Sequence, residues 1–162
     1  KWEAKELEGV FDGLEVDVIY SPEKNNIYVG RIVADTSKNQ TLDDWMSILQ
    51  NPEKMSFWID FKNLSRENAN AALDVFDLIT KKYNIHDNCF IESQDIETLK
   101  IVKERNYFTI LWVENLHYWK KRQLKDTIFV MNKIRSQIEE LQPDAISSLN
   151  WKDETNHEKI IR

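Results

Sequence analysis

Two carboxylates lie two residues apart in a segment that otherwise has the composition of a buried strand. Glu15 and Asp17 flank Val16 within the run Leu14–Tyr20. Because the side chains of a strand alternate between its faces, we expect Glu15 and Asp17 to point one way and Val16 and Val18 the other. Two negative charges on one face of an apolar strand repel each other and cost free energy to desolvate. A divalent cation is the simplest partner that would make the pair favourable.

A third carboxylate and an ammonium share one face of a second strand-like run. In Met55–Lys62, Asp60 and Lys62 are two residues apart among aromatic and aliphatic side chains. One interpretation is a structural ion pair near the end of the strand. The other is a metal-binding carboxylate beside a phosphate-binding ammonium, which suits an anionic substrate held on a cation. The second interpretation is favoured beside Glu15 and Asp17, because Asp60 would add a third ligand to the same site.

Strand-like runs alternate with amphipathic stretches along the chain. The six predicted strands are Leu14–Tyr20, Ile27–Gly30, Met55–Lys62, Asn88–Glu92, Tyr107–Val113 and Ala145–Leu149. Capping residues and apolar spacings of three and four predict helices that begin at Thr41, Ser65 and Asp95, a long helix from Leu124 to Leu141, and a last one over Lys152–Arg162. This order implies parallel strands joined by right-handed crossovers.

The alternating order fits either an open doubly wound sheet or a TIM-type (β/α) barrel. No glycine-rich phosphate turn follows the first strand, as a Rossmann-type sheet would require. In a barrel, polar residues gather at the carboxyl ends of the strands. Such residues end five of the runs: Glu15 and Asp17, Asp60 and Lys62, Glu92 and Ser93, Trp112 and Glu114, and Ser147 and Ser148. We therefore predict the α/β class and a TIM-type barrel.

The predicted barrel forms a single domain over residues 1–162, and we expect it to be incomplete. A full barrel needs about 200 to 250 residues, and only five or six strands can be placed in 162. We expect residues of a larger protein to be omitted at the ends and near Gly30-Arg31.

Three further residues are candidates for the mouth of this barrel. Glu92 either faces the site or caps the helix that follows it. Trp112, like Trp58, lies in a strand and could wall a pocket, although core packing is the commoner role of a strand tryptophan. His117 follows a strand end and is the one histidine retained as a catalytic candidate.

Composition excludes several other classes. The net charge of −6 argues against nucleic acid as a partner, because phosphate backbones require a basic surface. No apolar run is long enough to cross a bilayer. A single cysteine, Cys89, rules out an intrachain disulfide. We expect a soluble protein, with the cytoplasm favoured as its compartment.

Three segments resemble the motifs of glycerophosphodiester phosphodiesterases. Phe11–Val18 is similar to the DGxExDV strand of that family, Ile59–Lys62 to its IEIK strand, and Asn88–Leu99 to its strand-to-helix passage SFdpeaL. The resemblance runs from the N-terminus to about Val113 and more loosely to Leu149. It implies a TIM-type barrel of the phospholipase-C-like phosphodiesterase superfamily that hydrolyses glycerophosphodiesters to an alcohol and glycerol 3-phosphate.

The resemblance also implies roles for individual residues. Glu15, Asp17 and Asp60 would hold Mg²⁺ or Ca²⁺, and Lys62 would contact the phosphate. Glu92 and Trp112 are the remaining candidates for substrate contacts.

The chain departs from the family pattern at the catalytic histidines. One family histidine lies in an HRG strand that would precede Lys1. The other belongs to an HD pair, and Arg31 and Ile32 stand in its place. Asp60 also replaces a glutamate. Without its histidines, the chain should lose roughly two to four orders of magnitude in rate per missing acid or base.

These observations leave three functions open. The first is a metal-dependent phosphodiester hydrolase acting on a small-molecule glycerophosphodiester. The second is a non-catalytic protein that binds phosphate or a sugar phosphate on the same scaffold. The third is a purely structural βα domain whose acidic residues are solvated, as on a half-exposed antiparallel strand.

Overall fold

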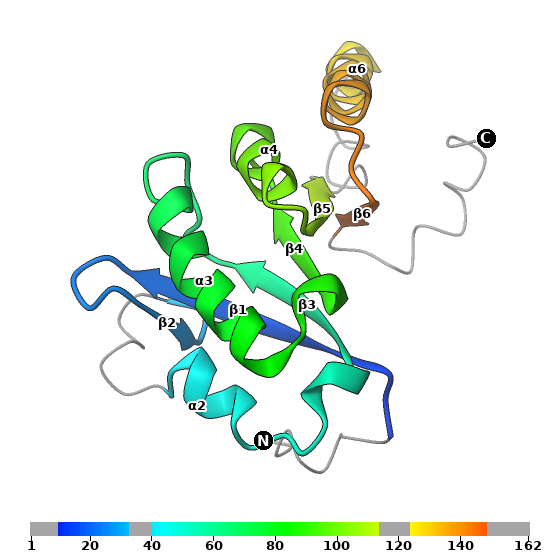
Figure 1. Ribbon diagram of the computed structural model, residues 1–162. Coiled ribbons are helices and arrows are strands. Elements are labelled where there is room, and N and C mark those ends of the chain that lie inside the picture. The colour runs from blue at the N-terminus through cyan, green and yellow to red at the C-terminus, as the bar shows by residue number, and fades with distance from the viewer. Residues whose placement is uncertain (1–9, 33–39, 114–123, 149–162) are drawn as a thin grey trace.

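The computed structural model describes residues 10–32, 40–113 and 124–148. At its centre is a six-stranded sheet with the order β2-β1-β3-β4-β5-β6 (Figure 1). The strands are β1 (Gly13–Ser21), β2 (Asn26–Val29), β3 (Ser56–Phe61), β4 (Cys89–Ser93), β5 (Phe108–Val113) and β6 (Ala145–Ser148). Each matches a predicted strand closely, which confirms the mixed α/β class.

One strand runs against the predicted direction. All neighbouring pairs from β1 through β3, β4, β5 and β6 are parallel, as predicted, but β2 is antiparallel to β1. The physical reason is the short connection: Ser21 pairs with Asn26, and a parallel crossover needs a dozen or more residues. Asn25, with a φ of 44°, supplies the left-handed residue of this turn.

The helices also follow the sequence pattern. They are α2 (Leu42–Met46), α3 (Ala69–Tyr83), α4 (Ile96–Glu104) and α6 (Leu124–Leu141), with short 3₁₀ helices η2 (Pro52–Lys54) and η3 (His86–Asn88). The predicted caps of two helices are confirmed, because Thr41 accepts a hydrogen bond from the Asp44 N–H and Asp95 accepts one from the Glu97 N–H. The helix predicted over residues 152–162 lies outside the described residues.

The prediction that Ser65 caps α3 is wrong. The helix begins at Ala69, and Asn68 stands at its N-cap position. The Ser65 N–H instead donates to Asn68 Oδ1, at 2.8 Å, in a turn that precedes the helix. Side chains that bond to nearby backbone compete with helix formation, so the helix starts after this turn.

The core lies between the helices and one face of the sheet. Helices α3 and α4 cover that face (Figure 1), and their apolar side chains meet those of the strands. The fully buried side chains of this layer include Phe57, Ile59, Leu73, Phe76, Ile91, Leu99 and Leu111. The opposite face of β1 and β3 carries Glu15, Asp17, Trp58 and Asp60, which are exposed or half-buried.

The sheet is wound in one direction but is not closed. From β1 to β6 the strands follow chain order apart from the β2 hairpin, without the reversal that defines a doubly wound sheet. In the described part of the chain, β2 and β6 form its two edges. The structure therefore does not contain a closed barrel, which takes eight strands. No helix in the described ranges is long and apolar enough to cross a bilayer.

Candidate metal and phosphate site

The parallel register places the predicted carboxylates side by side. Asp17 on β1 is the register partner of Asp60 on β3, and Asp60 is the partner of Glu92 on β4. Glu15 is opposite Trp58. Since side chains two residues apart share a face, all of these side chains lie on the face of the sheet that the core helices do not cover.

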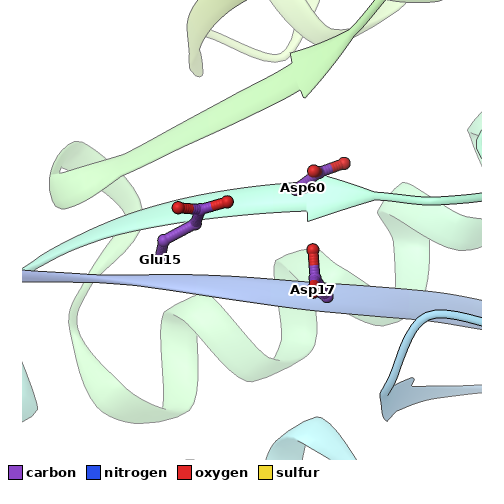
Figure 2. Close-up of side chains that lie close together, drawn as sticks. All are labelled: Glu15, Asp17 and Asp60. Atoms are coloured by element: carbon purple, nitrogen blue, oxygen red, sulfur yellow. The ribbon is translucent and has the colours of Figure 1, made fainter. Parts of the chain in front are cut away.

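Glu15, Asp17 and Asp60 form a compact acidic cluster, hereafter the acidic triad. One carboxylate oxygen from each lies within 4.8 Å of the others. Figure 2 shows the three side chains on the same side of β1 and β3. Asp17 and Asp60 are half-buried, whereas Glu15 is exposed. The structure thus brings together the three residues that the sequence identified as candidate metal ligands.

Two cations neutralise part of the triad. Lys62 Nζ lies 2.6 Å from Asp17 Oδ1 and also contacts Asp60 Oδ2, and Arg31 Nε lies 2.7 Å from Asp17 Oδ2. Burial by itself would lower the pKa of Lys62, but the contacts with the two aspartates outweigh it and raise that pKa above its ordinary value. The structural ion pair considered from the sequence is therefore present, and it includes Asp17 as well as Asp60.

Glu92 is the most deeply buried carboxylate near the triad, at 4% exposure. Trp58 Nε1 donates to its Oε2 at 2.5 Å, and Ser147 Oγ donates to its Oε1 at 2.6 Å. Burial raises the pKa of Glu92, and the charges of Asp60 and Glu15 raise it further, whereas the two hydrogen bonds oppose this shift. The ionised form of Glu92 is consequently less favourable here than in water.

A cavity of about 500 Å³ opens beside these residues. The residues predicted from the sequence that line it are Glu15, Asp60, Lys62, Glu92 and Trp112; Asp17 does not line it. Asp95 is the N-cap of α4, so the alternative in which Glu92 caps that helix is wrong. His117 lies outside the described residues.

Arg31 also lines the cavity, although it was not assigned to the site from sequence, and so does Trp58, which was named only as a tryptophan that could wall a pocket. Trp58 precedes Asp60 by two residues and must share its face, so the sequence also indicated which side of β3 it occupies. Ser93, Ser147 and Ser148, which the sequence placed at the carboxyl ends of their strands, line the cavity as well. Arg31 follows β2, and only the hairpin brings it to Asp17.

The donor chemistry of the triad fits a hard divalent cation. Mg²⁺ and Ca²⁺ both prefer carboxylate oxygens, and ligands on opposite sides of Ca²⁺ can be about 5 Å apart, which is compatible with the observed spacing. Asp17 Oδ1 is buried, and its one described contact is the Lys62 ammonium 2.6 Å away. A divalent cation bound by the triad would therefore take the place of the Lys62 ammonium at this oxygen.

Comparison with solved structures finds a likeness in fold. The chain resembles the crystal structure of a glycerophosphodiester phosphodiesterase from Parabacteroides distasonis, with a TM-score of 0.58 and 12% identity over 95% of this chain and 77% of that one. At this identity the likeness concerns the fold. No family model matches the chain, and no curated protein matches it.

Proposed function

We propose that this chain is a metal-dependent phosphodiester hydrolase that acts on glycerophosphodiesters on an incomplete TIM-type barrel over residues 1–162. One observation carries the proposal: three carboxylates from β1 and β3 converge beside Lys62, and two of them, Glu15 and Asp60, line a cavity of about 500 Å³. The fold likeness to a glycerophosphodiester phosphodiesterase supports it.

Each residue of the site has a defined task in this proposal. Glu15, Asp17 and Asp60 hold Mg²⁺ or Ca²⁺, and Lys62 binds a phosphate oxygen. A bound cation would supply Lewis-acid polarisation of the phosphoryl group. Arg31 adds a second positive charge at the same end of the cavity, where it favours an anionic group over a neutral one. Glu92 and Trp112 contact the remainder of the substrate.

A second function is favoured by a specific observation. Arg31 stands where the resemblance leads us to expect a catalytic histidine, and it forms an ion pair with Asp17. The one histidine in the described ranges, His86, packs its ring against Tyr107, with ring centroids 4.2 Å apart, and does not line the cavity. A site whose described residues include cations but no histidine suits a non-catalytic protein that binds phosphate or a sugar phosphate.

Two measurements test the proposal. Calorimetric titration with Mg²⁺ and with Ca²⁺ should give binding heat, and Glu15→Gln should weaken the affinity by about tenfold or more, because one of three charged ligands is neutralised. Incubation with glycerophosphocholine should release glycerol 3-phosphate, and the same substitution should reduce the rate.

Glu23→Gln is the matched control, because it removes an equal charge from an exposed residue in the turn of the same hairpin, away from the cavity. Absence of heat with either cation would exclude the metal-dependent function. Binding of inorganic phosphate without release of glycerol 3-phosphate would instead establish the non-catalytic alternative.

A further inference from the structure

The cavity has two chemically different ends. Arg31 and Lys62 provide positive charge beside β1 and β3. Across the sheet, Glu92 on β4 and Trp112 on β5 line the same cavity, and neither carries positive charge. Neighbouring strands are about 4.8 Å apart, so the two ends are separated by about one or two strand spacings. With a divalent cation on the acidic triad, as in the proposed function, a ligand that fills the cavity meets positive charge at one end and a carboxylate with aromatic side chains at the other.

Glu92 is a buried carboxylate without a cationic partner. Both of its hydrogen bonds come from neutral donors, Trp58 and Ser147, and no described lysine or arginine forms an ion pair with it. A carboxylate removed from water is costly unless an opposite charge compensates it. Because Glu92 lines the cavity, a cationic ligand group could reach it and supply that charge.

The tryptophans beside Glu92 determine which cation fits best. Trp58 and Trp112 both line the cavity, and both are half-buried. The face of an indole attracts a cation more strongly than any other aromatic side chain, and quaternary ammonium groups are typically bound this way. Each Glu92 oxygen already accepts one hydrogen bond, so the wall offers aromatic surface and charge rather than a full set of acceptors for a primary ammonium.

We propose that the end of the cavity formed by Glu92, Trp58 and Trp112 binds a quaternary ammonium of the choline type. This inference rests on the proposed function, under which the ligand is a zwitterionic phosphodiester. Its phosphate then lies at Lys62 and Arg31, and its ammonium lies at Glu92. One strand spacing is also the reach of a phosphate and an ammonium joined through two carbons.

The ammonium end can be tested without hydrolysis or metal. Choline is titrated into the full chain in EDTA, and the indole N–H signal of Trp58 is followed by NMR, because that group donates to Glu92. The comparison ligand is 3,3-dimethylbutan-1-ol, which has the shape of choline without its charge. We expect choline to shift the Trp58 signal saturably and the neutral alcohol to bind about tenfold or more weakly. Ethanolamine should bind more weakly than choline.

Two substitutions test which residues bind the ammonium group. Glu92→Gln keeps an acceptor for Trp58 and a polar contact for Ser147 but removes the charge, and Trp112→Leu removes the second indole. Each should weaken choline by about tenfold. The control Glu104→Gln removes the same charge from an exposed position on α4 and should leave choline binding unchanged.

Equal affinity for choline and the neutral alcohol, or unchanged choline binding in Glu92→Gln, would overturn the proposal, as would the absence of any choline-dependent shift. If Glu92→Gln does not fold, Trp112→Leu gives the same decision. Choline binding by a chain that releases no glycerol 3-phosphate would support the ammonium site while refuting the hydrolase.

Discussion

Lys62 stands between the acidic triad and any cation that the triad could bind. Its ammonium contacts Asp17 and Asp60, and three carboxylates are balanced by only two cations, Lys62 and Arg31. Replacing Lys62 with methionine keeps much of the side-chain volume and removes the charge. We predict that Lys62→Met lowers stability in the absence of a divalent cation and raises affinity for one.

The magnitude follows from the spacing of the carboxylates. Two unit charges 4.8 Å apart repel by about 3 kcal/mol at an effective dielectric constant of about 20. Arg31 and partial solvation reduce this cost, because Lys62 and both aspartates retain between 20% and 25% exposure. We therefore expect a loss of about 2 kcal/mol, or about 4 to 8 °C in Tm for a chain of this size.

Thermal unfolding in EDTA and in a Ca²⁺ series checks both parts of this prediction. In EDTA, Lys62→Met should melt below the wild type. In Ca²⁺ it should regain about 2 to 3 kcal/mol once the cation exceeds its Kd by about a hundredfold. Lys81→Met is the control, because it removes the same charge from an exposed position on α3. A Lys62→Met protein that melts like wild type in EDTA, or that gains nothing from Mg²⁺ or Ca²⁺, would refute the reasoning.

Three other predictions follow from single contacts. Burial raises the pKa of Glu92 above 4.5, so its stabilising contribution is present below the unfolded pKa and is lost as pH rises through the folded one. The free energy of unfolding of Glu92→Gln should therefore increase relative to that of the wild type from about pH 4 to pH 7. A difference between the two proteins in urea unfolding that stays constant with pH would contradict this. Gly13→Ala places a Cβ 2.8 Å from the Ser56 carbonyl oxygen and should lower the free energy of unfolding by about 1 to 3 kcal/mol in the same assay. An unchanged urea midpoint would show instead that β1 and β3 move apart at this position without cost. Burial raises the pKa of the Cys89 thiol to about 12, so an aromatic disulfide reagent at pH 8 should react with it only after unfolding, and rapid reaction of the folded chain would disprove its burial.

The sequence determined the local elements and the faces of the strands. Val16 and Val18 alternate with Glu15 and Asp17, and this period of two fixes which side chains share a face whatever the partner strand. The caps at Thr41 and Asp95 were equally readable, because a cap depends on residues no more than three positions apart. The strands and most helix starts could be placed from such short-range patterns.

The tertiary structure decided which faces meet. The register of β1 against β3 brings Asp17 beside Asp60, and the hairpin brings Arg31 to Asp17, although neither pairing has a local signature. Glu92 finds Trp58 34 positions away and Ser147 55 positions away. Strand order and register depend on packing across the whole sheet. The sequence therefore identified the acidic residues as candidates, whereas only the tertiary structure showed which cations and aromatic side chains lie beside them.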